Sequence, residues 1–239
     1  MKSILRLFTL LLFCGLAFGE LEAQFGVSGF YKVSQDDVVT EEYPDGNFFG
    51  NGYEVAADYW FRLPNKRIEF LPTVFYGRYE KEYEIRRAVD SQVFPVEANL
   101  SEFGFQLKTN FYIFDFGTDC DCPTWGKQGP ALHKGFFLQL APGISRLTNS
   151  FTIQDEELFE RRTGSTNFIL GVGAGIDFGI SNLITITPQV SYRHRFGESD
   201  LYSSDYDNTG LISLDYFTEQ QHNFLFGLRL GIRLDERRY

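Results

Sequence analysis

Sulfur-containing and histidine side chains are scarce in this 239-residue sequence, which has three cysteines, one methionine and three histidines. Long apolar runs are also missing. Beyond the N-terminus none approaches the roughly 18–20 residues that a transmembrane helix needs, so a membrane could be crossed only by β-strands. Positive charge is in deficit, with 22 Lys and Arg against 32 Asp and Glu. The resulting net charge of −10 argues against a general nucleic-acid binder.

Aromatic residues and glycine, by contrast, are abundant. The sequence has 26 Phe, 13 Tyr and 23 Gly, and 43% of its residues are hydrophobic. The hydrophobic share is ordinary for a folded protein, and the aromatic-rich, methionine-poor composition favours β structure.

The N-terminus has the three-part layout of a secretory signal peptide. Lys2 and Arg6 form a basic start, an apolar stretch covers 7–18, and small residues follow. We predict cleavage after Ala23, with Gly19 as the alternative. Cleavage after Ala23 leaves 24–239 as one exported domain that keeps Cys120 and Cys122.

Apolar and other residues alternate with a period of two after position 24, which predicts strands rather than helices. In 224–234, FLFGLRLGIRL, every even position is apolar, and 53–63 and 184–196 show the same pattern. The alternation predicts an all-β, eight-stranded antiparallel up-and-down barrel. Its strands are expected at about 25–34, 49–63, 67–83, 98–116, 134–148, 165–180, 183–197 and 221–235.

The predicted connections alternate in length. Short turns are expected at 64–66 and 181–182, and long polar loops at 36–47, 85–97, 150–164 and 198–221. Such asymmetry is typical of outer-membrane barrels. An even strand count puts both termini on the short-turn, periplasmic side, where 117–133 is an unusually long turn.

The glycines of 167–179, NFILGVGAGIDFG, indicate which face of the wall is wet. Glycine weakens a solvent-exposed strand, whereas a narrow lumen filled from opposite strands needs small residues. The apolar set is therefore expected to face lipid. A soluble barrel with the apolar set inside is the alternative.

Charges of both signs occupy the face opposite to the apolar set, where burial together lets them neutralise one another. A solvated surface mixture is the alternative. The expected lumen network comprises Glu54, Asp58, Arg62, Glu69, Glu102, Lys108, Asp177, Arg193, Arg195, Arg229 and Arg233.

From Gln24 to Tyr239 the chain resembles the small eight-stranded outer-membrane β-barrel family of Gram-negative bacteria (OmpA/OmpX-like). The resemblance lies in the signal peptide, the glycine-alternating strand 167–179 and the closing strand FLFGLRLGIRL. The family's last aromatic lies at the chain end in phase with the lipid face, but here Tyr239 follows DERR out of phase with Leu234. The resemblance implies a location in the outer membrane, contact with lipopolysaccharide, and assembly by the barrel-assembly machinery.

Local motifs add little chemistry. The glycines from Gly171 lack the spacing of a dinucleotide fingerprint. No cofactor, catalytic residue or metal site is predicted. Cys120 and Cys122, with Trp125 nearby, make either a structural turn with a strained disulfide or a contact site for a periplasmic or outer-membrane partner within 117–133.

Three functions remain open at this point. The preferred one is a non-enzymatic integral outer-membrane barrel with a structural, adhesion or complex-subunit role. A small lipid hydrolase or deacylase that uses His222, and a narrow passive pore, are the alternatives.

Overall fold

The computed structural model describes the backbone of ten ranges, which are 24–36, 51–62, 67–86, 93–114, 135–153, 159–181, 183–196, 199–206, 212–219 and 221–233. The predicted signal peptide, Cys120, Cys122 and Trp125 lie outside these ranges. Within them, no helix is long and apolar enough to span a membrane.

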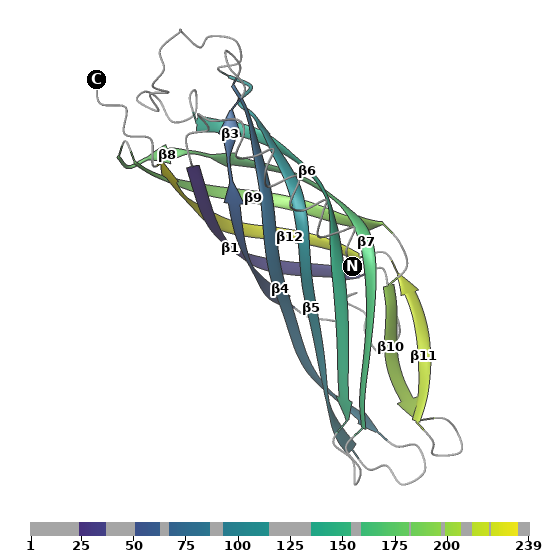
Figure 1. Ribbon diagram of the computed structural model, residues 1–239. Coiled ribbons are helices and arrows are strands. Elements are labelled where there is room, and N and C mark those ends of the chain that lie inside the picture. Colours follow the sequence, from purple (N-terminus) through teal and green to yellow (C-terminus); the bar gives the residue numbers. More distant parts are fainter. Residues whose placement is uncertain are drawn as a thin grey trace, which may run out of the picture.

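Eight antiparallel strands form a closed barrel (Figure 1) in the order β12-β1-β2-β4-β5-β6-β7-β9, and β12 pairs again with β9 to close the ring. The wall strands are β1 (Gln24–Asp36), β2 (Asn51–Tyr59), β4 (Ile68–Arg86), β5 (Val93–Phe111), β6 (Phe136–Ile153), β7 (Phe159–Ile176), β9 (Ile184–Phe196) and β12 (Gln221–Arg233). Two short strands, β3 (Phe61–Arg62) on β4 and β8 (Phe178–Gly179) on β9, extend the wall. The predicted eight-stranded fold is confirmed.

Four wall strands, β4 to β7, reach farther into the expected loops than predicted. β4 and β5 pair from Ile68↔Phe111 to Arg86↔Val93, so most of the expected loop 85–97 is strand. β6 and β7 likewise pair as far as Ile153↔Phe159, within the expected loop 150–164. The prediction was wrong there because the sequence of these segments mixes polar and apolar residues without a sustained alternation, and the pattern therefore assigned them to loops.

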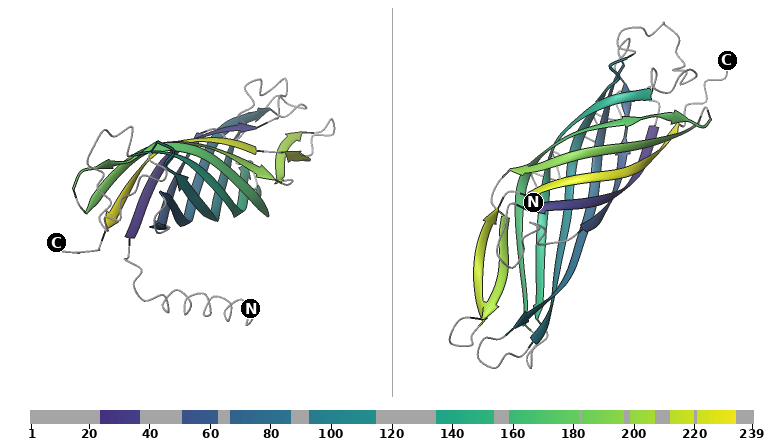
Figure 2. Two further views of the ribbon diagram at one scale, coloured as in Figure 1. Left: turned by 90° about the horizontal axis from the view of Figure 1, so that it is seen from above. Right: turned by 180° about the vertical axis from the view of Figure 1, so that it is seen from behind.

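The predicted loop 198–221 also contains strands. β10 (Ser199–Tyr206) pairs antiparallel with β11 (Ile212–Glu219) in a separate two-stranded sheet. Figures 1 and 2 show this hairpin beside the long ends of β4 to β7, which run beyond β1, β9 and β12. We call this end the loop end, and the opposite end, where β1 begins and β12 ends, the short-turn end.

The wall is polar inside and apolar outside. In β2, Glu54 and Asp58 are buried, whereas Tyr53 and Val55 are each 52% exposed. Successive side chains of a strand point to opposite faces, so the pleat of β2 aims its charges into the lumen and its apolar residues outward. The other wall strands repeat this arrangement.

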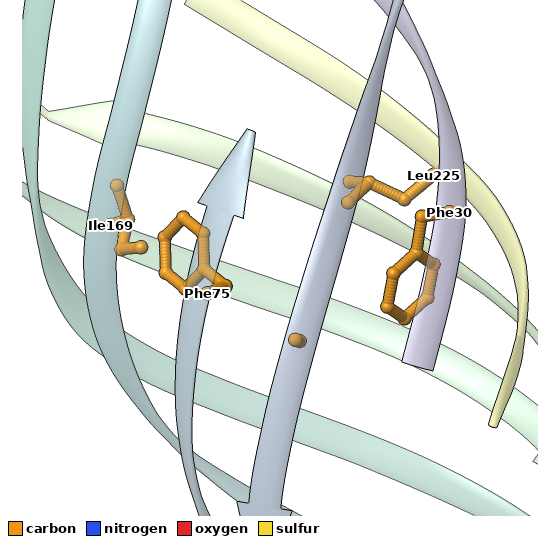
Figure 3. Close-up of a cluster of buried hydrophobic side chains, with 5 residues drawn as sticks. Phe30, Phe75, Ile169 and Leu225 are labelled. Atoms are coloured by element: carbon orange, nitrogen blue, oxygen red, sulfur yellow. The ribbon is translucent and has the colours of Figure 1, made fainter. Parts of the chain in front are cut away.

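Two clusters of apolar side chains cross the lumen between the charges. Phe30, Ala56, Phe75, Ile169 and Leu225 meet at mid-height (Figure 3). Trp60, Leu71, Tyr112 and Phe137 form the second cluster near the short-turn end. The middle of the lumen is therefore packed.

Glycine makes room for these large side chains. A Cβ atom added at Gly175 would lie 2.5 Å from Cζ of Phe137, which is closer than real Cβ contacts. Gly171 and Gly175 are buried on the inner face of β7, as expected, whereas Gly179 is exposed in β8. Asp177 is buried on the same inner face.

Candidate functional site

Five charged side chains meet in the lumen toward the loop end. Lys32 Nζ lies 2.7 Å from Glu102 Oε2 and 3.1 Å from Glu54 Oε2. Arg193 Nη1 donates to Glu54 Oε2 at 2.6 Å and its Nη2 to Glu54 Oε1 at 2.9 Å, which makes a bidentate pair. Arg195 Nη2 lies 2.9 Å from Glu102 Oε1, although not aligned as a hydrogen bond. We call these five residues the central ion cluster.

Aromatic rings hold the cations of this cluster from the side. Arg193 lies over Phe75, with its guanidinium carbon 4.3 Å from the ring centroid, and Lys32 Nζ lies 4.7 Å from the centroid of Tyr79. The Tyr79 hydroxyl donates to Asn223 Oδ1 at 2.5 Å. Desolvated cations gain from such ring contacts, so the cluster is stabilised by both opposite charge and ring faces.

A second polar group lies near the short-turn end. Arg229 makes a bidentate pair with Asp58, at 2.8 and 2.5 Å. The Tyr112 hydroxyl lies 2.7 Å from Glu69 Oε2 and 2.6 Å from Asp177 Oδ2. Polar contacts therefore link β2 to β12, and β4 to the end of β7, across the lumen.

The outer surface carries an apolar band that ends in aromatic rings. Ring contacts run from Phe25 to Tyr59, Phe61 and Phe70 at the short-turn end. Toward the loop end, exposed aromatics such as Tyr31, Tyr53, Tyr76, Phe103 and Phe168 occupy the outer face. An outward apolar band between two aromatic girdles is the pattern of a transmembrane barrel.

The band stops abruptly on β4 and β5. Tyr76 pairs with Phe103, and the next outward residues along the two strands are Arg78 and Ser101. Arg78 in turn contacts the polar residues that follow: its guanidinium lies 3.6 Å from the Glu80 carboxylate and donates to Asn99 Oδ1 at 2.9 Å. The wall thus changes from apolar to polar within one pair of residues.

Nine of the eleven charged residues predicted for the lumen have buried side chains: Glu54, Asp58, Glu69, Glu102, Lys108, Asp177, Arg193, Arg195 and Arg229. Four of them, Glu54, Glu102, Arg193 and Arg195, belong to one cluster, whereas Asp58 and Arg229 form a separate pair. Lys108 lies over the Phe30 ring at 5.0 Å. Arg62 and Arg233 lie in strands, but their side chains are outside the described set.

The prediction missed Lys32 and Tyr112, which are both buried contacts of predicted residues. Lys32 is in phase with Gly26 and Ser28 on β1, and this phase could have identified it. Tyr112 lies within the predicted strand 98–116, in phase with Lys108 and Asn110, so the same phase could have identified it.

Three outward residues near the loop end form a cluster on the β9–β12 seam. His194 and His222 are directly opposite each other, and Tyr192 is two residues before His194. Their rings are in contact, with centroids 4.8 Å apart for the two histidines and 5.8 Å apart for Tyr192 and His222. Among the described residues, no group of three or more His, Cys, Asp or Glu could hold a metal ion.

Comparison with known proteins reveals likeness only among solved structures. No family model and no curated protein matches the chain. Ail of Yersinia pestis is 12% identical, with 89% of this chain and 100% of Ail aligned and a TM-score of 0.47. A major outer membrane protein from Thermus thermophilus is 10% identical over 88% of this chain and 99% of that one, with a TM-score of 0.49. The outer membrane protease OmpT from Escherichia coli is 10% identical over 90% and 98%, with a TM-score of 0.43.

Proposed function

We propose that this chain is an integral outer-membrane β-barrel that serves as a non-catalytic surface-contact protein, with both termini in the periplasm and the loop end outside the cell. The observation that carries this proposal is the length of β4 to β7 relative to the apolar band on their outer face.

Strand length supports a part that stands clear of the membrane. β4 has 19 residues, which span about 60 Å at roughly 3.3 Å per residue. With a tilt of about 40°, this corresponds to about 46 Å along the barrel axis, against an apolar band of about 25 Å. The polar outer residues from Arg78 onward fall in the excess length. About 20 Å of a four-stranded sheet therefore extends beyond the lipid.

This protruding sheet has two strand edges. β4 pairs with β2 only as far as Tyr79, and β7 pairs with β9 only from Phe168 onward. In the described ranges, 80–86 and 159–167 consequently have a sheet partner on one side only. Edge strands present unpaired backbone groups to other chains, so the protruding sheet suits contact with an extracellular surface.

The packed lumen argues against a pore. The central ion cluster and the mid-height apolar cluster fill successive levels between opposite walls. A channel would need a continuous polar path of water, as wider barrels have. We therefore expect no steady conductance in a planar bilayer.

A lipid hydrolase is the second candidate, because His222 lies near the loop-end rim. The His222 ring contacts Tyr192 and His194. Acyl transfer would instead need a histidine that activates a serine nucleophile. If lipid A or phospholipid turnover appears on expression of the chain and disappears in His222→Ala, the non-catalytic proposal is wrong.

Shortening the protrusion tests the surface-contact role. The register pairs Glu82 with Glu97, so 83–96 can be replaced by Asn-Gly, which closes a two-residue hairpin. Bacteria that expose the full chain should attach to collagen- or laminin-coated surfaces or aggregate with one another, and the shortened chain should lose this. Equal behaviour of both chains at equal surface level, or no attachment by either, would contradict the role.

A further inference from the structure

The histidine pair on the outer wall brings two ring nitrogens and a hydroxyl oxygen close together. His194 Nδ1 lies 3.1 Å from His222 Nδ1, and the Tyr192 hydroxyl lies 2.5 Å from the same His222 nitrogen. Depending on the tautomer, the His222 nitrogen has one lone pair or one N–H, so it can make a full hydrogen bond to only one of these neighbours. The Tyr192 hydroxyl and His194 Nδ1 therefore compete for the same nitrogen.

The distance between the two nitrogens fits a shared metal ion. Zinc binds imidazole nitrogen at about 2.0–2.1 Å, and at the tetrahedral angle two such nitrogens lie about 3.3 Å apart. A right-angled arrangement, which copper prefers, gives about 2.9 Å. The observed 3.1 Å lies between these values. The ring centroids are 4.8 Å apart, so the rings present their Nδ1 edges to each other.

Backbone register fixes this arrangement. His194 and His222 are paired residues on adjacent antiparallel strands, which brings their Cβ atoms within about 5.5 Å of each other on the same face. Phe196 packs edge-on against His194, with centroids 4.4 Å apart, and Phe224 packs against Tyr192 at 5.2 Å. Both imidazoles are half-buried. The pair is therefore held in place before any ion arrives.

We infer that His194 and His222 form a binding site for a transition-metal dication of the Zn²⁺ type on the outer face of the barrel. Their Nδ1 atoms are the ligands, and the Tyr192 hydroxyl oxygen is within reach as a third donor. On binding, the ion takes the lone pair of the deprotonated His222 Nδ1, and the hydrogen bond between that nitrogen and the Tyr192 hydroxyl is broken.

The site lies at the base of the surface hairpin. The chain leaves the wall two residues after His194 and re-enters it at Gln221, immediately before His222, with β10 and β11 between these points. An ion bound there links the two strands from which the hairpin segment emerges. Metal binding would therefore clamp the last wall seam of the barrel at the point where the hairpin segment leaves it.

Calorimetric titration of the folded, untagged chain 24–239 in detergent with ZnCl₂ tests the inference. The protein should carry Cys120→Ser and Cys122→Ser, so that thiolates cannot bind zinc. We expect one zinc per chain. His194→Ala or His222→Ala should weaken binding by about tenfold or more, since even residues that only support a ligand change metal affinity by 10–100-fold.

His133→Ala, which alters the one remaining histidine, is the matched control and should bind as the parent does. Zinc should also raise the urea midpoint of unfolding of the parent, because a ligand that binds only the folded state stabilises it. The urea midpoint of His194→Gln should not change with zinc. Absence of binding by the parent, or equal binding by the double variant His194→Ala/His222→Ala, would overturn the site. A heat-modifiability gel verifies that each variant is folded.

Discussion

Replacing Glu102 by glutamine probes how the buried charges stabilise the barrel. Glu102 is fully buried and faces Lys32 at 2.7 Å, Arg195 at 2.9 Å and Arg193 at 3.8 Å. The central ion cluster has three cations and two carboxylates, a formal charge of +1. Glu102→Gln raises it to +2 without changing the shape of the side chain.

The expected loss is large. Removing one partner of a buried ion pair costs about 3–5 kcal/mol, because the remaining charge stays buried and uncompensated. The exposed pair Arg78–Glu80, at 3.6 Å with side chains 38% and 53% exposed, offers a matched control. Exposed pairs contribute about 0–1 kcal/mol, so Glu80→Gln should change the free energy of unfolding little.

Urea unfolding in lipid vesicles, monitored by heat-modifiability and intrinsic fluorescence, measures the free energy of unfolding of both variants. The free energy of unfolding of Glu102→Gln should fall by several times the change in Glu80→Gln. Equal, small changes in the two variants would refute the reasoning, since they would mean that Glu102 is solvated.

Three further changes address other parts of the wall. Leu228 points outward and is 58% exposed, so at mid-bilayer Leu228→Arg should lower the free energy of unfolding by about 2–4 kcal/mol. Phe25→Arg, near the interface, should lower it by about 0–1 kcal/mol. If Leu228→Arg left the free energy of unfolding unchanged, lipid contact at this position would be contradicted. Gly175→Ala should cost about 1–3 kcal/mol through overpacking against Phe137, and Phe137→Ala in the same chain should recover part of that loss; if the two costs simply add, the contact is unimportant. Tyr112→Phe removes the hydroxyl that lies near two carboxylates and should lower the free energy of unfolding by about 1–3 kcal/mol in the same urea assay. An unchanged urea midpoint would contradict those hydrogen bonds.

The fold could be predicted because the period-two pattern depends on a local rule. Wherever one face of a strand meets an apolar medium and the other a packed polar lumen, neighbouring residues differ in character. The segment 224–234 carries this difference at every position after Leu225, and β12 pairs in register with both β1 and β9. The same phase would have revealed Lys32.

The protruding parts could not be predicted in this way. Beyond Tyr76 on β4 and Phe168 on β7 the sequence becomes more polar, although the backbone pairing of the strands continues unchanged. β10 and β11 lie in a segment where the sequence contains many Asp and Ser residues, which the pattern assigned to a loop. The sequence also could not predict which charged residues pair within the lumen, because Glu54 and Arg193, for example, are 139 positions apart.

The most direct test of the central claim is whether the outer face of the wall touches lipid chains. A tryptophan placed at Phe226, an outward residue that is 51% exposed, can report this once Trp60 and Trp125 are replaced by phenylalanine. In vesicles of lipids with brominated acyl chains, Phe226→Trp should emit at short wavelength and be strongly quenched, whereas Leu225→Trp, on the inner face, should be quenched little. Long-wavelength emission from Phe226→Trp without quenching would mean that water, not lipid, surrounds the barrel.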